Sequence, residues 1–134
     1  SVLFYAVQGG LLGQPEMQVA GNNSSYDLLR WYVDRAGAEL QIDPLLIIAV
    51  MAVESSFNPI AESVAGAKGL MQVVPRFHMD KLPEEADRSA FLDPVTNVLV
   101  GARVLHESIR RSGGVESGLQ QFGGAINDPD RRYA

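Results

Sequence analysis

One glutamate stands at the end of an unbroken apolar run. The run occupies residues 45–53, and the glutamate is Glu54. A carboxylate beside so much hydrocarbon loses hydration, which favours the acid form, so we expect the pKa of Glu54 to rise toward neutral pH. A carboxyl group of this kind is suited to act as a general acid. The run alone leaves equally open that Glu54 ends a buried helix and points into solvent.

The same residues predict a helix that ends just after Glu54. Asp43-Pro44 is a capping residue followed by proline at the first helical position, so the helix begins there. It should end near Ser56, because the residue before Pro59 avoids the α region. The negative end of the helix dipole then adds to desolvation in raising the pKa of Glu54. Because the segment is apolar on every side, we expect it to be the central, buried helix.

The rest of the chain is also predicted to be helical. Apolar residues recur at spacings of three and four over residues 24–40. Asp93-Pro94 begins a long helix that ends at residues 112–114, and a short helix follows over about 115–122. Residues 76–92 read as an irregular connection with short helical turns. No strand pattern competes, so we predict a compact all-α domain around the buried helix.

The two ends of the chain differ in the structure that we expect of them. Residues 1–23 have turn formers at short intervals and are expected to be irregular, and their apolar beginning resembles the tail of a hydrophobic leader. Asp128-Pro129 is a third capping pair, announcing a helix that the chain scarcely begins. We therefore expect the catalytic domain to occupy residues 24–134 and to be cut short at its C-terminus.

Composition excludes several classes of function. The 134 residues fit one domain, carry a net charge of −5 and include no cysteine. Disulfides, zinc–thiolate sites and cysteine nucleophiles are therefore excluded. Scattered basic residues argue against nucleic-acid binding, and the longest apolar run is far below the roughly 20 residues of a membrane span. His78 and Asp80, with His106, form only a weak metal candidate, so we expect no metal or cofactor.

A dense pattern of residues extends from Glu54 to Pro75. It consists of Glu54-Ser55-Ser56-Phe57-Asn58-Pro59, Ala61, Ser63, Gly66-Ala67, Gly69-Leu70-Met71-Gln72 and Pro75. The pattern closely resembles the core motif of the soluble lytic transglycosylases, which are related in fold to goose-type lysozyme. Weaker resemblance continues through Asp93, Asn97 and Gly101, and the likeness covers roughly residues 25–134.

The resemblance implies a reaction with one catalytic carboxyl group. It implies cleavage of the β-1,4 bond between N-acetylmuramic acid and N-acetylglucosamine in peptidoglycan. Glu54 would protonate the glycosidic oxygen and then take the proton of the muramoyl C6 hydroxyl, which closes on C1 as a 1,6-anhydro ring. The substrate's N-acetyl group would stabilise the cation in place of the second carboxylate of ordinary glycosidases. Glu62 and Asp80, the nearest candidates for such a carboxylate, read as solvated charges.

The resemblance also implies residues that bind substrate. Ser63 would lie beside the acid and the acetamido group, although a serine at this position also suits a turn. Gln72 would hydrogen-bond a sugar, and Met71 beside it would supply packing in the cleft. Tyr133 matches a late tyrosine of the family, and it is expected either to line the cleft or to pack the final helix.

One departure from the family pattern bears on the rate. The family carries an alanine-tyrosine-asparagine motif whose tyrosine hydroxyl reaches toward the catalytic glutamate. Here the stretch reads Gln121-Phe122-Gly123, so Phe122 keeps the ring and lacks the hydroxyl. Losing a hydrogen-bond partner at a charged site costs about 1.5–3 kcal/mol. We expect a rate lower by one or two orders of magnitude unless Gln120 or Gln121 supplies another donor.

The resemblance further implies a cellular location and an oligomeric state, and it leaves two other functions open. It implies a monomer in the bacterial periplasm or secreted, acting on glycan strands, with room for a partner in an envelope or secretion complex. A hydrolase of goose-lysozyme type would use the same glutamate with an activated water. A catalytically weak module that only binds peptidoglycan is the alternative that Phe122 allows.

Overall fold

The computed structural model describes residues 24–123, and within this range every regular element is a helix. The predictions made for residues 1–23, Asp128-Pro129 and Tyr133 lie outside the described residues. The predicted all-α fold is confirmed. In chain order the helices are α3 (Ser24–Leu40), α4 (Pro44–Ser55), α5 (Pro75–His78), η2 (Met79–Lys81), η3 (Arg88–Leu92), α6 (Pro94–Ser112) and α7 (Val115–Phe122).

The two cap-and-proline pairs begin helices as predicted. The Asp43 carboxylate accepts a hydrogen bond from the backbone N–H of Leu45 at 2.9 Å and caps α4. Asp93 caps α6 by accepting from the N–H of Thr96 at 3.2 Å. Each carboxylate satisfies a backbone donor that has no partner within the helix. At the other end of α6, Gly113 takes a left-handed conformation with φ 81°, which favours glycine.

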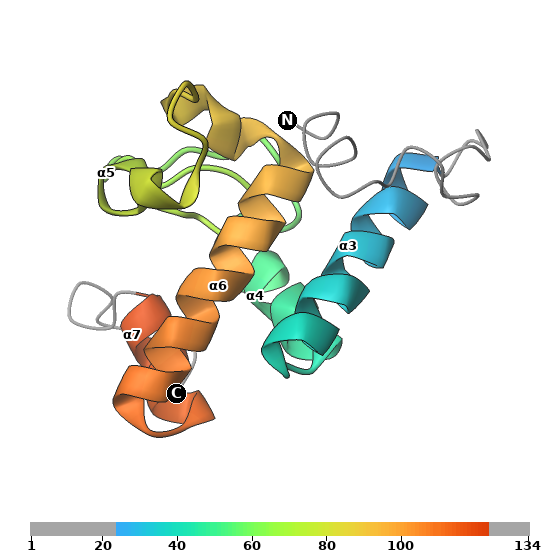
Figure 1. The fold of residues 1–134 in the computed structure, drawn as a ribbon, viewed down its shortest axis with the longest axis vertical. Coiled ribbons are helices and arrows are strands. Elements are labelled where there is room, and N and C mark those ends of the chain that lie inside the picture. The colour runs from blue at the N-terminus through green and yellow to red at the C-terminus, as the bar shows by residue number, and fades with distance from the viewer. Residues whose placement is uncertain (1–23, 124–134) are drawn as a thin grey trace.

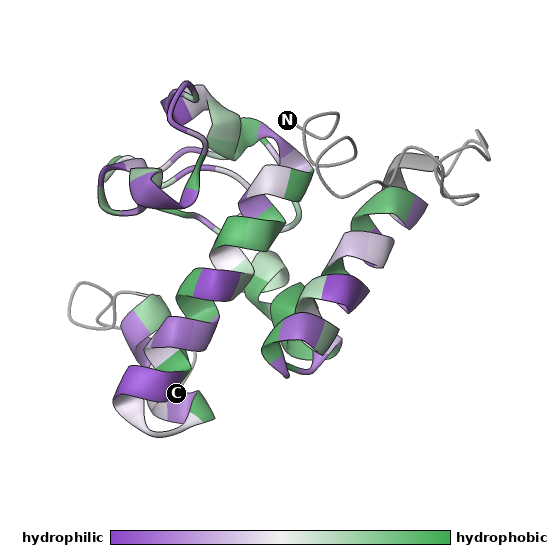
Figure 2. Ribbon diagram, in the orientation of Figure 1, coloured by the Kyte–Doolittle hydropathy of each residue, from purple (hydrophilic) through white to green (hydrophobic). Residues whose placement is uncertain are grey.

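The helices pack around α6, which runs through the middle of the view in Figure 1. Both α3 and α7 contact α6, and α4 contacts α3. Figure 2 shows hydrophobic and hydrophilic residues alternating along α3 and α6, as expected of helices with one face in a core. The buried apolar residues that form the main core come from α3, α4, the loop before α5, η3 and α6; they include Val33, Ile47, Val50, Met51, Leu70, Met71, Phe91, Val98 and Leu105.

Burial of α4 holds for one side of the helix only. Ile47 and Val50 are fully buried, and Met51 is 2% exposed. On the opposite side Leu45 is 63% exposed and Val53 is 38% exposed. The prediction of burial on every side came from an apolar run without periodicity, which does not distinguish the side that meets α3 and the loops from the side that faces outward.

Candidate active site

Glu54 lies in the last turn of α4, as the sequence predicted. The helix ends at Ser55, and Glu54 follows Val50 by four residues and Met51 by three. Residues at these spacings share one face of a helix. Glu54 therefore lies on the core-facing side of α4, and it is half-buried where its two neighbours are buried. A carboxyl group in this position is partly removed from water and still reachable.

The backbone turns sharply after Glu54. Ser56 and Phe57 both adopt left-handed conformations, with φ 51° and φ 64°. The N–H of Ser56 donates to the carbonyl of Ala52 at 3.1 Å, and the N–H of Phe57 donates to that of Met51 at 3.4 Å. These bonds occupy carbonyl groups that the end of a helix leaves without partners. The turn ends α4 directly after Glu54 and starts the loop that carries the other motif residues.

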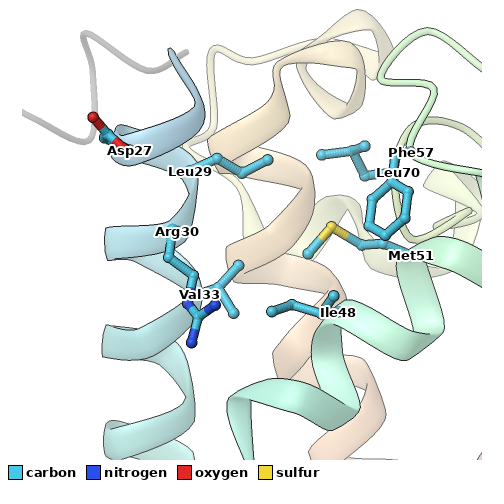
Figure 3. Close-up of a pocket in the computed structure, with 8 residues that line it drawn as sticks. All are labelled: Asp27, Leu29, Arg30, Val33, Ile48, Met51, Phe57 and Leu70. Atoms are coloured by element: carbon cyan, nitrogen blue, oxygen red, sulfur yellow. The ribbon is translucent and has the colours of Figure 1, made fainter. Parts of the chain in front are cut away.

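A pocket of about 380 Å³ opens beside this end of α4, between α3 and α4. Figure 3 shows Val33 of α3 and Met51 of α4 pointing toward it, whereas the carboxylate of Asp27 points away. Its remaining lining residues are Leu29, Arg30, Ile48, Phe57 and Leu70. Met51 and Phe57 each lie three residues from Glu54 along the chain, so the pocket adjoins the turn that bears the carboxyl group.

The loop after Glu54 is held against α6 by a buried asparagine. Asn97 is fully buried, and its Oδ1 accepts a hydrogen bond from the N–H of Met71 at 2.7 Å. Its Nδ2 donates to the carbonyls of Lys68 at 2.7 Å and Phe91 at 2.8 Å. The loop is closed on itself by paired backbone bonds of 2.8 and 3.0 Å between Lys68 and Val73. Asn97 therefore fixes where the motif loop lies.

Ser63 and Gln72 both make hydrogen bonds within this loop. The Ser63 hydroxyl accepts from the N–H of Ala67 at 3.0 Å, which is a bond typical of a turn serine. The Gln72 side-chain amide donates to the carbonyls of Ala61 at 3.2 Å and Gly69 at 3.0 Å. Both side chains are thus oriented by the loop backbone. Their roles toward a sugar stay predictions.

Met71 and Phe122 pack inside the domain. Met71 is fully buried and lies so close to Gly101 of α6 that a Cβ there would meet its Sδ at 2.5 Å. The side chain packs in the core and has no exposed surface, so a role for Met71 toward substrate in a cleft stays a prediction. Phe122, the last residue of α7, is half-buried and packs against the main core. A role for Phe122 in substrate binding stays a prediction.

The two candidates for a second carboxylate are exposed. Glu62 pairs with Lys68 across the loop, and its side chain is 51% exposed. Asp80 of η2 is also exposed. Neither carboxylate is surrounded by apolar groups in the way that a general acid requires. Asp27, the carboxyl group that lines the pocket, is exposed, whereas Glu54 is half-buried and lies three residues along the chain from each of the lining residues Met51 and Phe57.

His78, considered above as a metal ligand, takes part in a different contact. Its Nδ1 lies 3.2 Å from Nζ of Lys81, whose side chain is only 8% exposed. Within the described residues, no three His, Cys, Asp or Glu side chains are grouped to hold a metal ion. Lys81 also lies 3.6 Å from the carboxylate of Glu107 on α6, so the cluster joins the irregular connection to α6.

We expect this histidine to make stability depend on pH. Burial and then the charge of Lys81 lower the pKa of His78, and Arg111 adds to this, against the opposing effects of Glu107 and Asp80. The unfolded chain thus binds a proton more readily than the folded one, and the free energy of unfolding should decrease as pH falls below about 6.5. Urea unfolding between pH 7.5 and pH 5 measures the decrease. The His78→Gln variant should lose part of it, and an identical pH dependence in both proteins would contradict the expectation.

Comparison with known proteins supports the motif assignment. The sequence profile described as the transglycosylase SLT domain matches residues 31–125, which include α4, the loop and α6. The chain belongs to the transglycosylase SLT domain family. The resemblance stated from the motif is thereby confirmed. In this SLT domain, Glu54 and the loop held by Asn97 lie in the matched region.

Curated relatives of the SLT domain have names that agree with the family. A transglycosylase of Enterobacteria phage PRD1 is 34% identical over 74% of this chain and 36% of the phage protein. The membrane-bound lytic murein transglycosylase C of Sodalis glossinidius is 37% identical over 76% of this chain and 28% of that protein. That of Haemophilus ducreyi is 39% identical over 69% of this chain and 24% of its own length. The chain thus spans about a third or less of these relatives.

Two negative findings concern the SLT domain, one from solved structures and one from its own described helices. No solved structure matches it significantly. Among residues 24–123, no helix combines the length and the apolar character that crossing a membrane requires.

Two residues of the site were not recognised as such from the sequence. Asn97 was noted as part of the weaker resemblance, and Ser55 as part of the motif, but neither was assigned a role. The signal that could have identified Asn97 is an amide side chain on the otherwise apolar, core-facing side of α6, between Val95 and Val98. Buried amides require hydrogen-bond partners, so such a residue predicts a fixed contact with another segment.

Proposed function

We propose that this SLT domain cleaves the β-1,4 bond between N-acetylmuramic acid and N-acetylglucosamine in peptidoglycan and forms a 1,6-anhydromuramoyl product. The names of the relatives support the reaction class. The observation that carries the proposal is the place of Glu54, half-buried on the core-facing side of the last turn of α4, in the turn between Met51 and Phe57, which line a pocket. Partial removal from water is what a carboxyl group needs to deliver a proton near neutral pH.

Glu54 acts twice in this reaction. Its acid form gives a proton to the glycosidic oxygen, the bond from that oxygen to C1 breaks, and the N-acetylglucosamine side leaves as an alcohol. The resulting carboxylate accepts the proton of the muramoyl C6 hydroxyl while that oxygen bonds to C1. Glu54 ends in its starting form and no water is consumed. The acetamido group of the substrate stabilises the cation between the two steps, so exposed Glu62 is not needed as a second carboxylate.

We also propose which residues bind the sugar and where in the cell the domain acts. Ser63 and Gln72, oriented by the loop backbone, lie along the segment that leaves Glu54 and would contact sugar there. The domain would act as a monomer on glycan strands in the periplasm or outside the cell. An envelope or secretion complex would bring it to its substrate.

A digest of purified peptidoglycan tests the reaction. We expect muropeptides whose muramoyl end is lighter by one water than the reducing form, as measured by mass spectrometry. Products with a reducing end would instead indicate a hydrolase. Binding to peptidoglycan without release of any muropeptide would indicate a binding module, and either result would overturn the proposed reaction.

A further inference from the structure

One peptide group connects polar side chains of two different helices. It is the group between Leu70 and Met71, in the loop that follows the catalytic helix. Its carbonyl oxygen accepts a hydrogen bond from the hydroxyl of Ser55 at 2.8 Å, and its N–H donates to Oδ1 of Asn97 at 2.7 Å. The C=O and N–H of a trans peptide group are coplanar and point in opposite directions. This rigid group therefore connects α6 on one side to the last turn of α4 on the other.

The α6 end of this connection cannot turn easily. Asn97 is fully buried, and its Nδ2 donates to the carbonyls of both Lys68 and Phe91. Both amide hydrogens and one face of the amide oxygen are thus in use. Rotating the side chain would leave several buried polar groups without partners, which is strongly unfavourable. Asn97 is a fixed support.

The α4 end of the connection is the residue next to Glu54. The last turn of a helix lacks some of its backbone partners and tends to fray. The Ser55 hydroxyl has one hydrogen, which it shares between the Leu70 carbonyl at 2.8 Å and the Met51 carbonyl at 3.1 Å; the shorter contact ties the last turn to the loop. The direction in which Glu54 points depends on this turn staying helical.

We propose that Ser55 and Asn97 are positioning residues that orient Glu54 through the peptide group between Leu70 and Met71. The proposal rests on the proposed function, because it concerns the orientation of the proton donor. Neither residue needs to contact the substrate. A displacement of about 1 Å of a catalytic group can lower a rate by about 100-fold, so a support of this kind matters more for kcat than for binding.

The first test removes the hydroxyl at Ser55. In Ser55→Ala we expect kcat for muropeptide release to fall by between about 10-fold and 100-fold with KM little changed. Ser55→Thr keeps a hydroxyl that can donate to the Leu70 carbonyl, and it should restore most of kcat. A Ser55→Ala enzyme with the kcat of the wild type, or one whose loss appears entirely in KM, would overturn the proposal.

Thr96 provides the matched control. It is buried on α6 beside Asn97, and its Oγ1 donates to the Asp93 carboxylate at 2.7 Å, outside the connection described here. Thr96→Val should lower the midpoint of urea unfolding about as much as Ser55→Ala does, and should leave kcat unchanged. An equal loss of kcat in both variants would show a general effect of stability and would contradict positioning.

Amide hydrogen exchange measures how firmly the last turn of α4 is held, and it does not require enzymatic activity. The N–H groups of Ser56 and Phe57 donate to α4 carbonyls at 3.1 and 3.4 Å. Both should exchange faster in Ser55→Ala and in Asn97→Ala, and at the wild-type rate in Thr96→Val. If Asn97→Ala does not fold, the exchange rates measured in Ser55→Ala alone decide the test. Unchanged exchange in Ser55→Ala would overturn the proposal, whereas a wild type that releases no muropeptides would contradict the proposed function alone.

Discussion

Replacing Glu54 by glutamine is expected to reduce muropeptide release by about 10²- to 10⁴-fold, the usual contribution of a general acid or base. Glutamine has nearly the shape of glutamate, so the last turn of α4 should keep its structure. Its amide has no acidic proton to give to the glycosidic oxygen and no carboxylate oxygen to accept the C6 proton. Release of soluble muropeptides from peptidoglycan, measured by chromatography over time, gives the two rates.

Glu62→Gln is the matched control for this experiment. Glu62 undergoes the same chemical change eight residues along the chain, on an exposed side chain paired with Lys68. An exposed ion pair contributes about 0–1 kcal/mol to stability, so the variant should fold and retain the wild-type rate. Equal losses in both variants would indicate a two-carboxylate mechanism. An active Glu54→Gln enzyme would remove Glu54 from the mechanism.

Replacing Gly69 by alanine is expected to lower the free energy of unfolding by about 2–5 kcal/mol. Gly69 has φ 77°, a conformation that costs an L-residue about 1–2 kcal/mol. A Cβ at this position would also lie 2.3 Å from Nδ2 of Asn97 and 2.6 Å from the carbonyl oxygen of Phe91. The Asn97 Nδ2 and the Phe91 carbonyl oxygen are joined by a buried hydrogen bond, so moving either atom away from the new Cβ would break that bond at a cost in free energy. Urea unfolding followed by circular dichroism measures the change.

Gly66→Ala separates the two causes. Gly66 lies in the same loop with φ 91°, but nothing lies within 4 Å of the Cβ that alanine would add. This variant should lose only the conformational part, about 1–2 kcal/mol. If Gly69→Ala is no less stable than Gly66→Ala, the contact with Asn97 is not rigid, and the support inferred for the catalytic helix is weakened with it.

Local features of the sequence predicted the elements well. The cap-and-proline pairs at Asp43 and Asp93 predicted the starts of α4 and α6, and glycine at 113 predicted the end of α6. These signals act within a few residues, because a cap or a left-handed glycine satisfies groups in its own turn. The same locality explains why the exposed side of α4 was missed. Which side of an apolar helix faces the core depends on distant segments.

The sequence by itself determined the family, the all-α fold, and Glu54 at the end of a helix stopped before Pro59. These follow from contiguous residues: an apolar run, a cap, a proline and a motif. Only the tertiary structure decided that Asn97 holds the loop and that Ser55 shares a peptide group with it. Those contacts join residues 15 to 29 positions apart, so they exist only once α4, the loop and α6 have packed together.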